Sequence, residues 1–142
     1  MDTFSFDDFL AYIRDQPSLF DGSKARLHGK GEDIFSQGEV CPDVFILTQG
    51  LVKLHYVTIE GKEWIKSFIM DKGMLGSRAS QSLGQPSSFS ATCLEDCLVY
   101  SLSYKSFETL CAEDPKLAAM AFQFFQWLGL KKELRESINC CA

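Results

Sequence analysis

Glycines recur at nearly even intervals through the middle of the chain, where they bound short runs of β-branched and aromatic residues. Gly38, Gly50, Gly61 and Gly73 follow one another at spacings of 11 or 12 residues. One short strand and one tight turn fill such an interval, so the spacing predicts consecutive antiparallel strands over residues 22–102. Many short strands joined at glycine corners are typical of a sandwich or jelly roll.

Alternation within two of these runs indicates which side chains should face the core. Polar and apolar residues alternate in 51–56, which predicts a half-buried strand with His55 on its exposed face. The turn Glu60-Gly61-Lys62 predicts a hairpin, and the alternation continues in the returning run. One face of that run is expected to carry Ile65, Ser67 and Ile69, with Ser67 pointing inward, and the other face Trp64, Lys66 and Phe68.

Helical periodicity replaces the strand pattern at both ends of the chain. Residues 1–20 predict a short amphipathic helix that ends before Pro17. Residues 103–112 predict a second short helix, and Pro115 is placed to open a long helix over 115–138. The predicted fold class is therefore α+β: an antiparallel β-roll of the jelly-roll or double-stranded β-helix kind, with a short N-terminal and a long C-terminal helix.

The long helix carries residues at alternating spacings of four and three, which is a heptad pattern. We expect this seam to pair with a second copy of the chain; packing onto the β-roll would account for Phe122, Phe125 and Leu128 on neighbouring faces. The seam consists of Met120, Phe124, Trp127, Lys131, Leu134, Ile138 and Cys141.

Composition limits the classes of function. A chain of 142 residues that is 46% hydrophobic makes one folded domain and is too apolar for disorder. No apolar run reaches the roughly 20 residues of a membrane span, and the acidic N-terminus lacks the basic start of a signal peptide. We therefore expect a cytoplasmic protein that does not bind membranes. A net charge of −5 makes it a poor nucleic-acid binder by itself.

The six cysteines are expected to be reduced thiols, because an export signal is lacking. Cys93 and Cys97 would share one face of a strand. The sequence contains no C-x-x-C pair, and both histidines lie far from any cysteine, so neither a zinc ion nor an iron–sulfur cluster is expected. His28 is expected on a solvated basic surface. A metalloenzyme of the cupin type would need more histidines than His28 and His55, so we do not expect an enzyme.

An ordered series of motifs runs through the predicted roll. It starts with K-G-E-D-I-F-S-Q-G-E at 30–39 and continues with V-F-I-L at 44–47 and G-L-V-K-L at 50–54. Glu60-Gly61-Lys62-Glu63, Leu75-Gly76 and Ser90-Ala91-Thr92 follow in the same order. Over residues 22–138 this series resembles the cyclic-nucleotide-binding domain of CRP/FNR-type transcription regulators.

The resemblance implies more than a fold. It implies a ligand cassette at about 74–92, a homodimer through the long helix, and a rigid-body change of that helix when a ligand binds. In the family a C-terminal winged helix-turn-helix reads DNA. This chain ends before such a domain, so DNA binding is expected only through a domain that it does not contain.

The cassette departs from the family at its two charged positions. The family glutamate, which binds the ribose hydroxyl, falls on Ser77, and the family arginine, which binds the phosphate, falls on Phe89, or on Ser87 with a shifted gap. Arg78 could substitute, but it would point about 100° away from the Ser77 direction on a helix. Each lost charged hydrogen bond removes about 1.5–3 kcal/mol, so we expect neither cAMP nor cGMP to be the ligand.

The effector itself stays open in this reading: a small polar or anionic metabolite, or none if the pocket is structural. Serine hydroxyls could contact it, although turn serines commonly satisfy their own backbone. Lys132 and Glu133 align with positions that reach the nucleotide base in the family, or simply form a solvated helix face. The pocket candidates are Ser67, Gly76, Ser77, Arg78, Ser87, Ser88, Phe89, Ser90, Lys132 and Glu133.

The sequence thus predicts a ligand-sensing and dimerisation domain of a CRP/FNR-like transcription regulator, with a degenerate nucleotide pocket. A stand-alone binding module and a protein-interaction scaffold with a vestigial pocket are the alternatives.

Overall fold

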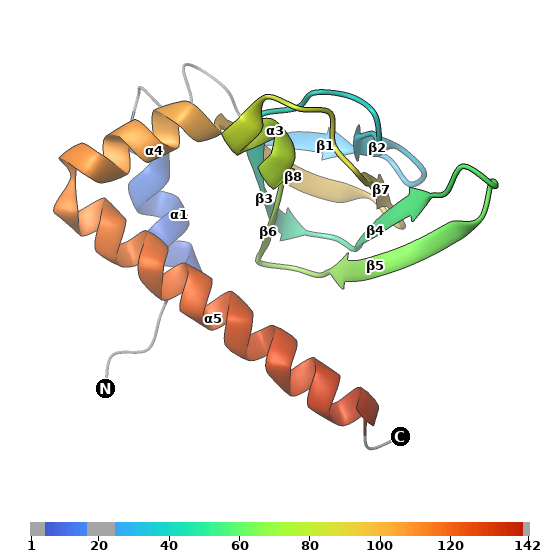
Figure 1. The fold of residues 1–142 in the computed structure, drawn as a ribbon. Helices are drawn as coiled ribbons and strands as arrows, with labels where there is room; N and C mark the ends of the chain where they lie inside the picture. The colour runs from blue at the N-terminus through green and yellow to red at the C-terminus, as the bar shows by residue number, and fades with distance from the viewer. Residues whose placement is uncertain (1–4, 17–24, 141–142) are drawn as a thin grey trace.

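The computed structural model describes residues 5–16 and 25–140, with the backbone alone over 131–140 (Figure 1). A β-roll forms one half of the molecule, and three of the helices pack beside it. The elements are α1 (Phe6–Arg14), β1 (Arg26–His28), β2 (Asp33–Phe35), β3 (Asp43–Gln49), β4 (Val52–Val57), β5 (Glu63–Ile69), β6 (Gly73–Leu75), α3 (Arg78–Leu83), β7 (Ser90–Cys93), β8 (Cys97–Ser103), α4 (Tyr104–Glu113) and α5 (Pro115–Cys140).

The strands form two four-stranded antiparallel sheets. One has the order β1-β8-β3-β6 and the other the order β2-β7-β4-β5. Glycine corners join strands as the spacing predicts: Gly50 turns the chain from β3 to β4 at φ +130°. Gly61 closes the β4–β5 hairpin at φ +85°. The predicted α+β fold with an antiparallel roll, an N-terminal helix and a long C-terminal helix is confirmed.

Two hydrophobic clusters share strand β3. Phe45 and Leu47 point between the sheets, whereas Val44 and Ile46 point toward the helices. We call the first cluster the roll core and the second the helical core. The buried residues of the roll core are Phe35, Phe45, Leu47, Val52, Leu54, Leu75, Ala91, Cys93, Cys97 and Val99. Those of the helical core are Phe6, Phe9, Ile13, Val44, Ile46, Leu102, Phe107, Leu117, Ala121 and Phe124.

Side-chain caps set the boundaries of the helices around the helical core. The Ser5 hydroxyl accepts a hydrogen bond from the Asp8 amide at 3.2 Å and starts α1. Between α4 and α5, Asp114 Oδ1 accepts from the Lys116 and Leu117 amides at 3.0 and 3.2 Å. Tyr12 of α1 donates to Asp114 Oδ2 at 2.6 Å, so one carboxylate both caps α5 and ties α1 to it.

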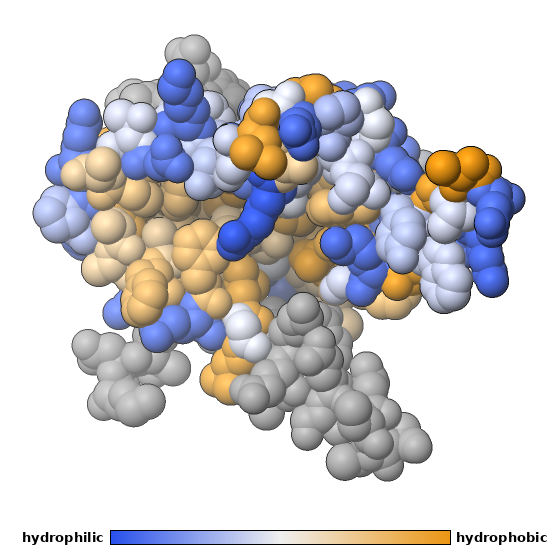
Figure 2. All heavy atoms as spheres, in the orientation of Figure 1, coloured by the Kyte–Doolittle hydropathy of each residue, from blue (hydrophilic) through white to orange (hydrophobic). Residues whose placement is uncertain are grey.

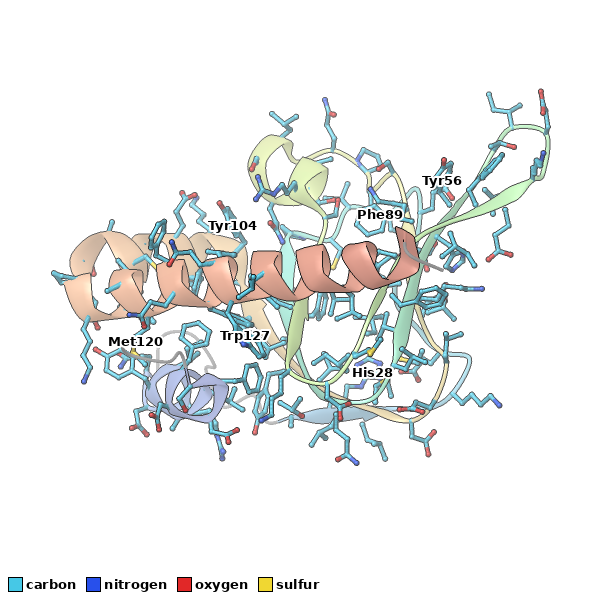
Figure 3. The ribbon with its side chains drawn as sticks, turned by 90° about the horizontal axis from the view of Figure 1, so that it is seen from below. His28, Tyr56, Phe89, Tyr104, Met120 and Trp127 are labelled. Carbon is cyan, nitrogen blue, oxygen red and sulfur yellow. The ribbon has the colours of Figure 1, made fainter. Side chains whose placement is uncertain are left out.

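The rotation of α5 about its axis corrects the predicted seam. Phe124 is only 1% exposed and packs in the chain's own core, and Met120 and Trp127 pack partly buried against that core (Figure 3). Phe124 is therefore not available to a second copy. Phe122 and Phe125, expected to pack onto the roll, are instead 63% and 48% exposed. Residues three apart share a helix face, so Phe122 and Phe125 lie together opposite the core.

A β-bulge corrects the predicted faces of the β4–β5 hairpin. Ser67 pairs with Leu54, but Ile65 pairs with His55, so Lys66 is an extra residue in the ladder. An odd insertion reverses the alternation beyond it. Ile65 is therefore turned outward and exposed, whereas Trp64 shares the face of Tyr56, its partner in the ladder.

Both histidines are more buried than the sequence suggested. The side chain of His55 is 16% exposed because neighbouring strands flank it in the middle of β4, and it contacts Thr92 and Glu63. His28 is 8% exposed and its Nδ1 contacts the Glu32 carboxylate four residues ahead. The predicted solvated positions are therefore wrong: Glu32 contacts His28 and Thr92 contacts His55 Nε2, whereas His55 Nδ1 is buried without a hydrogen bond to the described residues.

Candidate functional site

The cassette between β6 and β7 is shaped by a close approach of the backbone. A Cβ on Gly76 would lie 3.0 Å from the Asp43 carbonyl oxygen, so no larger residue fits there without a shift. Ser77 follows, is buried, and accepts a hydrogen bond from the Ser80 amide at 3.3 Å. The residue in the family glutamate position is thus the N-cap of α3, and its hydroxyl is engaged within the chain.

The other buried serines of the cassette are held in the same way. Ser87 Oγ donates to the Phe89 carbonyl oxygen at 2.7 Å. Ser90 Oγ accepts from the Gln37 amide at 2.8 Å. Ser80, which sequence reasoning missed, donates to the Gln85 carbonyl oxygen at 2.6 Å and accepts from the Cys41 amide at 3.1 Å. These hydroxyls hold the cassette loop in place, and those of Ser80 and Ser87 already use their donors within it.

Phe89, at the family arginine position, belongs to an aromatic stack inside the roll. Its ring meets Phe35 edge to face at 5.3 Å between centroids, and Phe35 stacks on Phe45 at 5.8 Å. The Lys66 ammonium lies 4.7 Å from the centroid of the Phe89 ring. Figure 3 shows Phe89 on the roll side of the molecule, together with Tyr56 from β4. An aromatic ring and a lysine therefore lie together at the place where the resemblance predicts the family arginine.

The remaining cassette candidates are spread around this pair. Ser67 is half-buried and its hydroxyl makes only a long bond of 3.4 Å to the Phe68 carbonyl oxygen. Ser88 is exposed. Arg78 is exposed and lies near Tyr104 of α4: a hydrogen bond to Glu108 raises the pKa of Tyr104, and the Arg78 charge opposes that effect.

Several predicted residues fall where only the backbone is described. Over 131–140 the chain continues α5, which packs on α1 and α4 at its other end and extends past the roll (Figure 1). The predictions outside the described side chains are Lys132 and Glu133 in the pocket and Lys131, Leu134 and Ile138 in the seam, together with Cys141.

A polar network covers the outer face of the second sheet. Thr92 donates to Asp33 at 2.6 Å and lies 2.7 Å from His55 Nε2. Glu63 lies 2.8 Å from the Lys53 ammonium and 3.4 Å from His55 Nδ1, and the Lys53 hydrogen bond lowers the pKa of Glu63. Only the alternation of Lys53 with His55 signalled this face in the sequence. The network links four strands on the side away from Phe89.

The thiols of the roll core, Cys93 and Cys97, are buried. Cys93 ends β7 and Cys97 begins β8, so the two residues lie on consecutive strands rather than on one strand as predicted. Burial, with a contribution from Cys97, raises the pKa of Cys93 to about 12. Among the described side chains, no three His, Cys, Asp or Glu groups lie close enough to hold a metal ion. No described helix is both long and apolar enough to cross a membrane.

A shallow depression opens elsewhere, on the outer side of α4. None of the predicted pocket residues belongs to the described part of its lining. That lining consists of Ser103, Lys105, Ser106, Thr109, Leu110 and Glu113.

Several solved structures share this fold. The catabolite activator protein of Thermus thermophilus superposes with a TM-score of 0.65 at 18% identity, over 94% of this chain and 59% of its own. CprK, in its oxidised form with o-chlorophenolacetic acid, gives 0.63 at 18% identity, over 98% and 54%. The sensor domain of DNR from Pseudomonas aeruginosa gives 0.63 at 20% identity, over 86% and 78%.

These similarities establish the fold, and the chain spans little more than half the length of the first two proteins. No curated protein matches the sequence. Residues 26–114, which contain the roll, the cassette and α4, match the family described as the cyclic nucleotide-binding domain. The chain therefore belongs to the cyclic nucleotide-binding domain family.

Proposed function

We propose that this chain is the ligand-sensing and dimerisation domain of a CRP/FNR-like transcription regulator and that its pocket does not respond to cAMP or cGMP. The observation that carries the proposal is Phe89. The resemblance assigns it, or Ser87 with a shifted gap, to the arginine position of the family cassette, and its ring packs against Phe35. A sensor that keeps the fold but has a phenyl ring in place of the arginine that binds the phosphate is expected to have a different effector.

The second charged position supports the same conclusion. A glutamate side chain at position 77 would accept hydrogen bonds from a ribose, whereas Ser77 is buried and already caps α3. Losing two charged interactions of about 1.5–3 kcal/mol each weakens cyclic nucleotide binding by roughly a hundredfold or more. A small polar or anionic effector remains compatible with this fold, since CprK carries o-chlorophenolacetic acid.

Dimerisation would use α5, on a face different from the predicted seam. Phe122, Phe125 and Leu130 are exposed on this helix, and Figure 2 shows apolar residues gathered over its first turns. A second copy packing along α5 would bury these side chains. An effector in the roll would then change the dimer geometry, and a DNA-binding domain outside this chain would read DNA in the cytoplasm. This is the function of a sensor, not of an enzyme.

Calorimetry tests the nucleotide part of the proposal. The wild-type chain should show no micromolar affinity for cAMP, and Phe89→Arg should raise the affinity roughly ten- to hundredfold, because one charged contact returns. Ser88→Arg is the matched control, since it adds the same charge at the neighbouring exposed position. Micromolar binding of cAMP to the wild type would refute the degenerate pocket.

Sedimentation tests the dimer. Phe122→Glu should shift the dimer toward monomer, whereas Leu83→Glu on α3, which also replaces an exposed apolar residue, should not. A monomeric wild-type chain would favour the alternative of a stand-alone module. A dimer that is insensitive to Phe122→Glu would place the interface elsewhere.

A further inference from the structure

The bulge in β5 gives the pocket a cation that the family pattern does not contain. We propose that Lys66 is the anion anchor of this pocket and that the ligand is an aromatic monocarboxylate, whose carboxylate binds Lys66 and whose ring packs on Phe89. This inference rests on the proposed ligand-sensing function and names the chemistry of its effector.

The bulge determines where Lys66 points. Regular alternation from Ser67, whose partner in the ladder is the buried Leu54, would place Lys66 on the outer face with Lys53 and Glu63. The extra residue breaks that alternation and brings the Lys66 ammonium over the Phe89 ring at 4.7 Å. The side chain is thus directed toward the cassette, at the position where the family arginine is missing.

The charge of Lys66 is available to a ligand. In the part of the chain with described side chains, Lys66 has no carboxylate within ion-pair distance, and Phe89 is its only recorded polar or ring partner. The nearest acidic residue along the strand, Glu63, lies on the opposite face, where Lys53 and His55 engage it. An exposed cation–π contact stabilises weakly, by about 0.5–1 kcal/mol, so a carboxylate can displace or share it.

The neighbouring groups select a monocarboxylate with a ring. Phe89 is half-buried and held edge to face by Phe35, so it offers a fixed apolar surface beside the ammonium. Ser67 adjoins Lys66 and its hydroxyl makes only a 3.4 Å bond, which leaves it free to donate a better one. The Lys66 ammonium can bind a carboxylate oxygen while the Phe89 ring, 4.7 Å from that ammonium, packs on an aromatic ring of the same molecule. A phosphate dianion needs more donors, and the Ser80 and Ser87 hydroxyls already donate within the cassette loop.

The test is a two-dimensional amide NMR titration with benzoate, with benzyl alcohol as the neutral probe of the same ring. Benzoate at millimolar concentration should shift the amides of Lys66, Ser67 and Phe89, and benzyl alcohol should bind at least roughly tenfold more weakly. Lys66→Met should weaken benzoate roughly ten- to hundredfold with an unchanged melting temperature. Lys53→Met on the outer face of the same hairpin should bind benzoate like the wild type.

Three results would overturn the assignment: no benzoate binding to the wild type, equal affinity for benzoate and benzyl alcohol, or equal affinity of the Lys66→Met variant. Each of these leaves the sensor function to be judged separately by the cAMP calorimetry and the sedimentation of the Phe122→Glu variant. A dimer with no cAMP affinity and a Lys66-independent ligand would retain the proposed function and reject this anchor.

Discussion

Truncation of Phe124 tests which face of α5 belongs to the chain's own core. Its side chain is 1% exposed, and its ring centroid lies 5.0 Å from that of Phe9, 5.7 Å from that of Phe6 and 5.9 Å from that of Trp127. Phe→Ala at such a site destabilises a protein by about 3–5 kcal/mol, from lost burial and the cavity left behind. Phe122→Ala, at 63% exposure on the opposite face of the single chain, should change the stability of the monomer by no more than about 0.5 kcal/mol.

Urea unfolding followed by tryptophan fluorescence and circular dichroism measures both values. The loss of about 3–5 kcal/mol expected for Phe124→Ala is a large share of the roughly 5–15 kcal/mol by which a domain is stable, so this variant could unfold. Phe124→Leu, with an expected loss of about 1–1.5 kcal/mol, provides a variant that stays folded. The effect of Phe124 should not depend on protein concentration, since its partners are in the same chain. If Phe122 pairs with a second copy, the effect of Phe122→Ala should instead shrink on dilution, as the dimer dissociates and the interface contributes less to stability. A larger loss for Phe122→Ala than for Phe124→Ala at a concentration where the chain is monomeric would refute the orientation of α5.

Two further predictions concern a glycine corner and a helix cap. Gly50→Ala should lower the free energy of unfolding by about 2–5 kcal/mol in urea, because a left-handed φ of +130° is combined with a Cβ only 2.5 Å from Cys97 Sγ. Gly61→Ala, with φ +85° and open space, should lose only about 1–2 kcal/mol, and equal losses would contradict the close approach. The hydrogen bond from Tyr12, followed by those from backbone amides, lowers the pKa of Asp114 in the folded chain. The ionised carboxylate therefore stabilises the fold at any pH above the pKa of Asp114 in the unfolded chain. This stabilisation is lost as the pH falls through the lower pKa of the folded chain. Asp114→Asn should therefore lower the melting temperature at neutral pH, and the difference from the wild type should shrink below about pH 4. A difference that is the same at both pH values would contradict a role for the ionised carboxylate.

The fold was predictable because its signals are local and repeated. Glycine corners, strand alternation and the proline before α5 each specify an element without knowledge of its neighbours. The motif series around Gly38 and Gly50 added the order of those elements. These signals predicted the roll and the helices that the structure contains.

The orientation of individual side chains was less predictable, since it depends on partners distant in sequence. In the sequence of α5, a heptad seam for a second copy and an apolar face for the chain's own core give the same spacing of apolar residues. The contacts of Phe124 with Phe6 and Phe9 of α1 show that it faces the chain's own core. The bulge at Lys66 has no glycine or proline to signal it. It arises from the pairing of β4 with β5, so strict alternation assigned Ile65 to the wrong face.

Strand β3 has a mechanical consequence because it is buried on both faces. Val44 and Ile46 anchor it to the helices, and Phe45 and Leu47 anchor it to the interior of the roll. Loosening of either the roll core or the helical core would disturb β3, which contributes buried side chains to both. The roll and the helical layer should therefore unfold as one cooperative unit. The amides of β3 should accordingly be among the slowest to exchange with solvent. Any displacement that a bound molecule imposes on Phe45 would pass through a single peptide bond to Val44 and Ile46, and thus to the helices.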